Sequence, residues 1–132
     1  MRLALLLQVA SLEKPDARPV PATSAWLVGT WLHSADKDDL ERVACKSGTT
    51  FTYRAGGKTD FFEGKGRWQL RRDRLTETVT EIDGTFAEPA LVAQIGTSDD
   101  SHLIRIGPHE GVRVLTDGTR DRMLRCRPGD IQ

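Results

Sequence analysis

The chain has little of several features, and each scarcity excludes a class of protein. No apolar run approaches the roughly 20 residues that a helix needs to cross a bilayer, so we predict no stable membrane span. The 132 residues carry 19 basic and 19 acidic side chains, and this zero formal net charge provides no long-range field to attract nucleic acid. The two cysteines and three histidines lack CxxC or paired-histidine spacing, so we predict no metal and no cofactor.

Catalytic motifs are lacking too. His33, His102 and His109 are scattered along the chain. Ser101 and His102 are neighbours that a strand would place on opposite faces, so they do not form a nucleophile held against its base. We predict that the protein is not an enzyme.

The first 25 residues have the composition of a targeting segment followed by a linker. Met1 and Arg2 precede the apolar run Leu3 to Ala10, whose length lies in the range of a secretory signal. Several prolines in a polar context follow, which suits an extended linker. We therefore predict a signal peptide and Pro-rich linker over 1–25, a barrel domain over 26–132, and a periplasmic or secreted location. The alternative is that the apolar run forms a buried helix or strand of the fold.

Short alternating runs separated by turn dipeptides occupy most of the remaining chain. In Arg67 to Arg71, for example, Trp68 and Leu70 share one face of a predicted strand. We also expect a strand at Leu91 to Ile95. About eight strands joined in sequence predict an all-β fold, a single antiparallel up-and-down barrel or rolled meander, with a two-sheet β-sandwich as the alternative.

The domain is expected to begin with a strand and one short helix. Trp26 to Leu32 is aromatic and β-branched, which favours a first strand, and Gly29 allows a neighbouring ring or backbone to approach closely. Ser34 to Ala44 begins with capping residues and an acidic first turn. This pattern predicts a short helix that could close one mouth of the barrel.

The direction in which Glu77 and Glu81 point is open. If Leu75 and Val79 face the interior, strict alternation places both carboxylates on the same inward face. An inward carboxylate would contact either a ligand or an inward arginine. We favour the other interpretation, a splayed strand with both carboxylates in solvent.

Two short motifs resemble known families. Gly29-Thr30-Trp31, followed by a meander with an arginine in its last strand, resembles the lipocalin-like barrels, especially the small domains of bacterial secreted proteins. This resemblance implies that Trp31 plugs one end of the barrel and that Arg125 or Arg127 covers it. Cys45-Lys46-Ser47-Gly48, with a terminal Cys126, is similar to periplasmic lysozyme-inhibitor barrels.

The two cysteines bear on the cellular compartment. In an exported small domain Cys45 and Cys126 would normally pair, and the bond would close a loop of about 80 residues, worth about 4.5 kcal/mol in the loop-entropy model. In a cytosolic protein they would instead be ordinary buried thiols.

Three functions remain open, and we expect a monomer in each. A binding barrel for a small apolar or amphipathic molecule predicts an internal cavity. The aromatic residues expected to line it are Phe51, Tyr53, Phe61 and Trp68. A protein-binding module, such as an enzyme inhibitor, would use the loops 55–58 and 64–66 at one end. A structural barrel without ligand would be filled by its own side chains. We favour the first.

Overall fold

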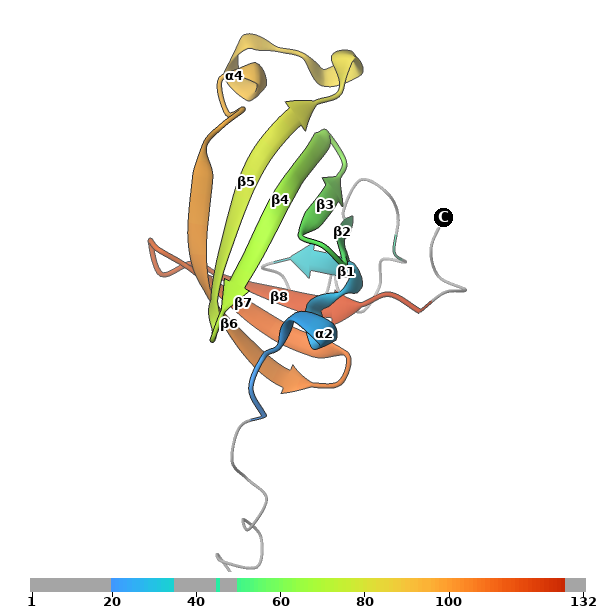
Figure 1. Ribbon diagram of the computed structural model, residues 1–132, viewed down its shortest axis with the longest axis vertical. Helices are drawn as coiled ribbons and strands as arrows, with labels where there is room; N and C mark the ends of the chain where they lie inside the picture. Colours follow the sequence, from blue (N-terminus) through green and yellow to red (C-terminus); the bar gives the residue numbers. More distant parts are fainter. Residues whose placement is uncertain (1–19, 35–44, 46–49, 128–132) are drawn as a thin grey trace, which may run out of the picture.

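The computed structural model describes residues 20–34, 45 and 50–127. Within these residues eight antiparallel strands form a closed barrel, in which each strand pairs with its neighbours in sequence and β8 closes against β1 (Figure 1). The strands are β1 (Gly29–Ser34), β2 (Thr50–Arg54), β3 (Lys58–Phe61), β4 (Gly64–Arg71), β5 (Arg74–Ile82), β6 (Ser98–Gly107), β7 (Glu110–Leu115) and β8 (Arg120–Arg125). This confirms the predicted all-β up-and-down barrel and excludes the sandwich.

The residues just before β1 form a helical turn. Thr23 caps α2 (Ser24–Leu27), because its hydroxyl accepts a hydrogen bond from the backbone N–H of Trp26 at 3.2 Å. The predicted first strand was therefore wrong for Trp26 and Leu27, where the cap and burial of both side chains outweigh β-propensity. The predicted helix after the first strand falls mostly on 35–44, outside the described residues.

The connection between β5 and β6 lies at the other end of the barrel (Figure 1). It contains η2 (Gly84–Phe86) and α4 (Pro89–Val92), with Pro89 in the first turn of α4. The strand expected at Leu91 to Ile95 is therefore wrong. Proline fixes a helical φ and has no N–H to donate to a ladder, so it favours the start of a helix here.

The core fills the end of the barrel that α2 covers. Trp31 is fully buried, its indole N–H donates to the backbone oxygen of Leu27 at 2.7 Å, and its ring lies 4.8 Å from that of Trp26. The other buried members of this cluster are Ala22, Tyr53, Trp68, Leu75, Leu103 and Met123. The barrel is thus solid at the α2 end.

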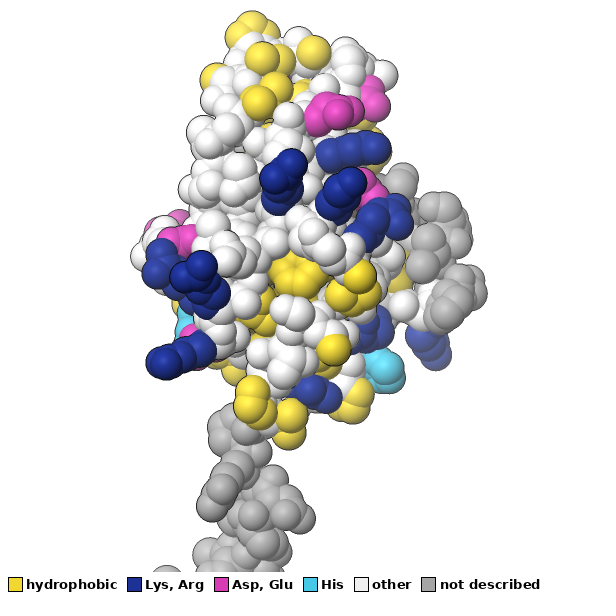
Figure 2. All heavy atoms as spheres, viewed as in Figure 1, with side chains coloured by type: hydrophobic (Ala, Val, Ile, Leu, Met, Phe, Trp, Pro, Cys, Tyr) yellow, Lys and Arg dark blue, Asp and Glu magenta, His cyan; other side chains and the backbone are white. Residues whose placement is uncertain are grey.

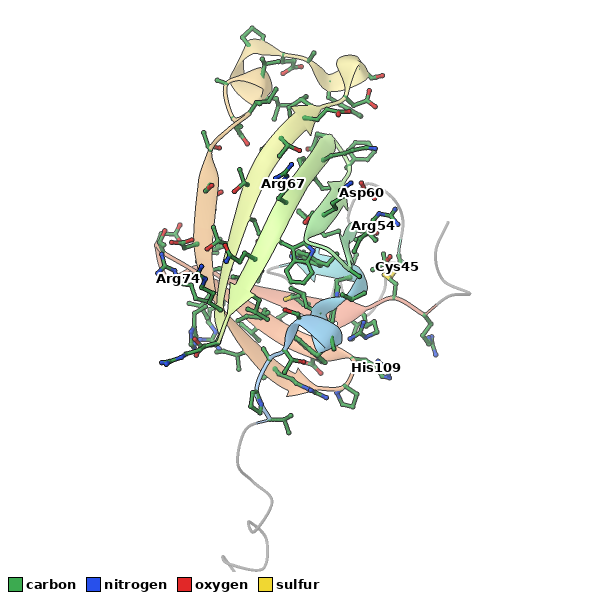
Figure 3. All side chains as sticks on the ribbon, in the orientation of Figure 1. Cys45, Arg54, Asp60, Arg67, Arg74 and His109 are labelled. Atoms are coloured by element: carbon green, nitrogen blue, oxygen red, sulfur yellow. A yellow bond between two sulfur atoms is a disulfide. The ribbon has the colours of Figure 1, made fainter. Side chains whose placement is uncertain are left out.

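A disulfide joins Cys45 to Cys126, as predicted, with 5.9 Å between the Cα atoms (Figure 3). Leu32 and Leu124 pack against the bond in a second small apolar cluster. A disulfide is consistent with an exported protein, because thiols stay reduced in most cytosols. No helix among the described residues is long and apolar enough to cross a bilayer.

Candidate functional site

The end of the barrel opposite α2 is hollow. A cavity of about 410 Å³ lies among the strands from β2 to β7 and reaches the α4 segment. Its walls contain apolar side chains from four strands and α4, namely Phe51, Phe61, Val79, Ile82, Leu115 and Leu91. Polar and charged groups line it as well, namely Thr59, Glu63, Glu77, Thr78, Gln94, Asp99, Ser101 and Arg113.

A β-bulge decides which carboxylates face this cavity. Gly66 pairs with Val79 and Lys65 pairs with Glu81, so Thr80 is an extra residue on β5. Glu77 therefore shares the inward face of Val79 and lines the cavity, whereas Glu81 is exposed outside the barrel. The prediction that both carboxylates lie in solvent was wrong for Glu77.

Glu77 belongs to a largely buried ionic network centred on Arg113. The guanidinium of Arg113 donates from Nη1 to Glu77 Oε1 at 2.6 Å and from Nη2 to Asp121 Oδ2 at 2.8 Å. The Tyr53 hydroxyl donates to the other oxygen of Glu77 at 2.9 Å. The three charged side chains are only 13–19% exposed. One cation is thus shared between two carboxylates beside the cavity.

The network fixes the protonation states of its members. Burial acts to lower the pKa of the Arg113 guanidinium, but Glu77 and its other partners outweigh burial and raise that pKa above its ordinary value. Burial, followed by the nearby charge of Glu77, raises the pKa of Tyr53 well above its ordinary value. At neutral pH Arg113 is therefore charged, and Tyr53 keeps the proton that it donates to Glu77.

Three polar atoms around the cavity have no hydrogen-bond partner within the described structure. They are Thr59 Oγ1, Ser101 Oγ and Arg113 Nε. Thr59 is 4% exposed and Ser101 is 6% exposed, and both line the cavity together with Arg113. Buried polar groups are almost always paired in folded proteins, since an unpaired one costs about 1–3 kcal/mol. The lining of the cavity thus includes two hydroxyls and one N–H donor without a partner among the described residues.

Comparisons with known proteins do not identify the chain. No family model, curated protein or solved structure matches it. The resemblance to lipocalin-like barrels therefore stays a prediction, and the functional argument depends on the cavity itself.

The structure brings two of the four predicted lining residues to the cavity. Phe51 and Phe61 form part of its wall, with ring centroids 6.0 Å apart. Tyr53 is fully buried beneath it and serves the ionic network. Trp68 belongs to the core, where its indole N–H donates to the backbone oxygens of Arg54 and Lys58 at 3.1 Å and its ring packs edge-on against Tyr53.

The residues of the Gly-x-Trp motif lie together at the closed end. The guanidinium of Arg125 is 4.3 Å from the centre of the Trp31 ring and donates to the backbone oxygens of Val28, at 2.9 Å, and Trp26. Gly29 has φ +140°, and a Cβ there would stand 2.5 Å from Arg125 Nη1, so a side chain at this position would strain the backbone and displace the guanidinium. Arg127 is exposed. This end of the barrel has a structural role.

Sequence patterning missed Thr59, Ser101, Asp121 and Arg113. Val112 to Leu115 alternates, but the usual hydrophobic reading turns the two valines inward, whereas the barrel turns Arg113 and Leu115 inward. One signal in the sequence could have identified Arg113. If Glu77 points inward, its buried carboxylate requires a buried cation as a partner.

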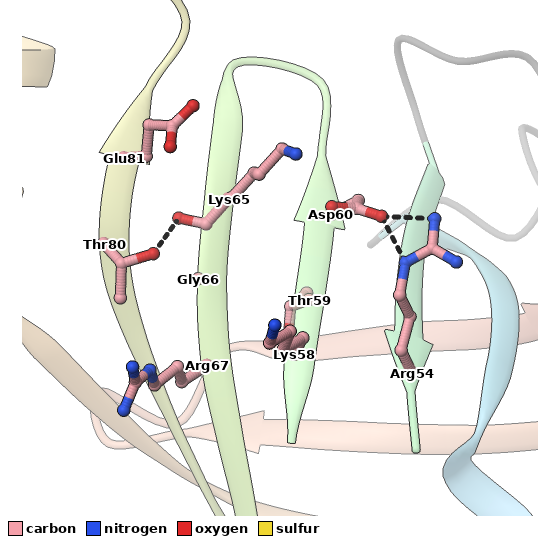
Figure 4. A pocket seen from close by; sticks show the side chains of 9 residues that line it. All are labelled: Arg54, Lys58, Thr59, Asp60, Lys65, Gly66, Arg67, Thr80 and Glu81. Carbon is pink, nitrogen blue, oxygen red and sulfur yellow. Dashed lines mark hydrogen bonds and ion pairs between the residues drawn. The ribbon is translucent and has the colours of Figure 1, made fainter. Parts of the chain in front are cut away.

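A second depression, of about 430 Å³, lies on the outer face of β3, β4 and β5 (Figure 4). Arg54 pairs there with Asp60 at 2.5 Å. Lys58 stands directly opposite Arg67 on the neighbouring strand, and in the described part of the chain neither side chain has an anionic partner. We call this depression, with its four cations Arg54, Lys58, Lys65 and Arg67, the outer groove.

The loops expected to form one protein-binding end do not lie together. Residues 64–66 belong to β4, and the β2–β3 and β3–β4 turns lie at opposite ends of β3, as consecutive turns of an antiparallel meander must. Exposed apolar side chains gather instead near the α4 segment, where Phe62, Val92 and Ile95 are 43–45% exposed. Figure 2 shows apolar side chains at this end of the molecule and basic ones across the face below it.

Proposed function

We propose that the protein is a non-catalytic barrel that binds a small amphipathic molecule in its interior, in the manner expected of a lipocalin-like protein. The observation that carries the proposal is the combination of an open cavity with three unpartnered polar atoms on its wall, those of Thr59, Ser101 and Arg113. A barrel that only had to be stable would fill this end with apolar side chains and leave no buried group unsatisfied.

The lining supports an amphipathic rather than a wholly apolar ligand. Phe51, Phe61, Val79 and Leu115 offer contact to an apolar body. The two hydroxyls and the Nε–H of Arg113 offer hydrogen bonds to a polar group. The volume of about 410 Å³ lies near the lower end of the usual range for ligand pockets, about 300–1,000 Å³, which favours a small molecule.

Export completes the proposal. The Cys45–Cys126 bond supports an oxidising compartment, and the apolar segment Leu3 to Ala10 supports a signal peptide. We therefore place the binding function in the periplasm or outside the cell.

A fluorescence titration tests the proposal. The apolar probe N-phenylnaphthylamine is added to the purified protein, and we expect saturable enhancement with one site per chain. Ser101→Leu, which places an isobutyl group in the cavity, should abolish the enhancement. Ser98→Leu is the matched control, because Ser98 is exposed on the same strand and does not line the cavity. Circular dichroism checks that both variants fold.

Two results would contradict the binding function. One is the absence of saturable enhancement in the wild-type protein, which would favour a structural barrel. The other is equal enhancement in Ser101→Leu and in the wild type, which would place the probe elsewhere. Native mass spectrometry of protein taken unrefolded from its own host, before and after denaturation, should show the natural ligand leaving on unfolding.

The outer groove favours a second candidate function, the docking of an acidic protein segment. Like charges directly opposite on neighbouring strands are destabilising, and Lys58 and Arg67 are such a pair. An acidic partner would remove that cost. Pull-down from the native compartment with the wild type and with Lys58→Glu/Arg67→Glu tests this function, which requires a partner that the charge-reversed variant loses.

A further inference from the structure

The ionisable groups of the cavity are predominantly acidic. Three carboxylates, those of Glu63, Glu77 and Asp99, line it against a single cation, Arg113. Arg113 is already shared between Glu77 and Asp121. The cavity and the network beneath it therefore contain four carboxylates and one guanidinium, so their combined charge is negative.

Two of these carboxylates oppose each other. Glu77 on β5 is the direct cross-strand partner of Asp99 on β6, and both line the cavity. Both oxygens of Glu77 are engaged, by Arg113 and Tyr53. Asp99, by contrast, makes no ion pair or side-chain hydrogen bond with any residue that the structure describes. Like charges in this position are destabilising, so the pair is a cost that a cation between them would remove.

We propose that the ligand of this cavity is a cationic amphiphile, whose ammonium group is held by Asp99 beside Glu77 and whose apolar body lies along Phe51 and Phe61. The inference depends on the binding function proposed above and names its ligand class. An N–H of the ammonium group donates to the Asp99 carboxylate. The unpartnered hydroxyl oxygens of Thr59, on β3, and Ser101, on β6, are further acceptors that line the same cavity.

The same arrangement acts against a fatty-acid carboxylate. Arg113 already shares its charge between Glu77 and Asp121, and its Nε is the only guanidinium nitrogen that has no hydrogen-bond partner among the described residues. A ligand carboxylate there would approach three negative charges, those of Glu63, Glu77 and Asp99, against the one positive charge of Arg113. Repulsion between charges is screened less inside a protein cavity than in bulk water. A neutral alcohol is not repelled by these carboxylates as a ligand carboxylate is, nor attracted by them as an ammonium group is. The predicted order of affinity is ammonium, then alcohol, then carboxylate.

Three ligands with the same alkyl chain test this order. Decylammonium, decanol and decanoate are titrated at pH 7, below their self-association concentrations, by displacement of N-phenylnaphthylamine. We expect decylammonium to bind about tenfold more tightly than decanoate, with decanol between them. Asp99→Asn should weaken decylammonium about fivefold and leave decanol unchanged, as expected for an ion pair to the exposed carboxylate of Asp99.

Glu81→Gln provides the matched control. It removes a carboxylate from the same sheet, but the bulge places Glu81 outside the barrel, so none of the three ligands should change in affinity. Tighter binding of decanoate, or an unchanged decylammonium affinity in Asp99→Asn, would overturn the cationic ligand and leave the binding barrel intact. Failure of all three compounds to displace the probe would overturn the binding barrel as well.

Discussion

The unpartnered hydroxyl of Thr59 leads to an unusual prediction, that removing a polar group stabilises the ligand-free protein. Thr59→Val keeps the β-branched shape and deletes a buried hydroxyl that has no hydrogen-bond partner in the described structure. If this position serves binding, the same substitution should weaken the ligand. Stability and affinity would then change in opposite directions.

The magnitude follows from burial. A buried, unsatisfied polar group costs about 1–3 kcal/mol, and water in the adjacent cavity relieves part of that cost. We therefore expect Thr59→Val to raise the free energy of unfolding by about 1 kcal/mol. For a domain of this size, that corresponds to a Tm about 4 °C higher.

Thr30→Val is the matched control. The Thr30 hydroxyl pairs with that of Thr52 across β1 and β2 at 2.9 Å, so its removal loses a hydrogen bond and should lower stability by about 1 kcal/mol. Urea unfolding followed by tryptophan fluorescence measures both variants, with unchanged m-values as the check on two-state behaviour. Equal destabilisation by Thr59→Val and Thr30→Val would refute the reasoning, because it would show that Thr59 is already paired.

Three further predictions concern the network, the disulfide and pH. Arg113→Met leaves two half-buried carboxylates without their cation and should cost about 3 kcal/mol in urea unfolding; a loss below about 1 kcal/mol would mean that the network is well hydrated. Reducing Cys45–Cys126, which are 81 residues apart, should cost about 4.5 kcal/mol, as unfolding with and without reductant would show. Burial, then the charge of Arg113, holds the pKa of His33 well below its ordinary value. The unfolded chain therefore binds the proton more readily below about pH 6.5, and stability should fall as pH decreases from there. His33→Phe should lack this part of the loss, and an identical pH profile in the variant would contradict it.

The closed fold could be predicted because most of the strands can be recognised from their own local sequence. Apolar and polar residues alternate strictly in Arg67 to Arg71, and turns that contain glycine or Asp-Gly separate most of the other strands. Short turns of this kind favour antiparallel pairing of strands in sequence order, as the barrel has. The errors fall where local chemistry competes with propensity. Thr23 begins a helix ahead of Trp26, and Pro89 begins another where Leu91 to Ile95 suggests a strand.

The candidate site was only partly predictable, because side-chain direction depends on register. The β-bulge at Thr80 adds one residue to β5, which places Glu77 inside the barrel and Glu81 outside it. No local sequence pattern predicts this bulge. Arg113 faces inward because closure of the barrel places Glu77 and Asp121 there. The sequence indicated that the aromatic residues face the interior, but side-chain size alone could not distinguish those in the cavity wall from those in the core. Phe51 and Phe61 belong to the wall, and Tyr53 and Trp68 belong to the core.

The central claim is that a ligand meets the unpartnered polar atoms inside the barrel. NMR titration with decanol tests it most directly, because the Nε–H of Arg113 and the amides of Thr59 and Ser101 give separate resonances. The account predicts saturable shifts of all three, with the largest at the Arg113 Nε–H. Shifts confined to the outer groove, at Lys58, Lys65 and Arg67, or no shifts at saturating decanol, would contradict it.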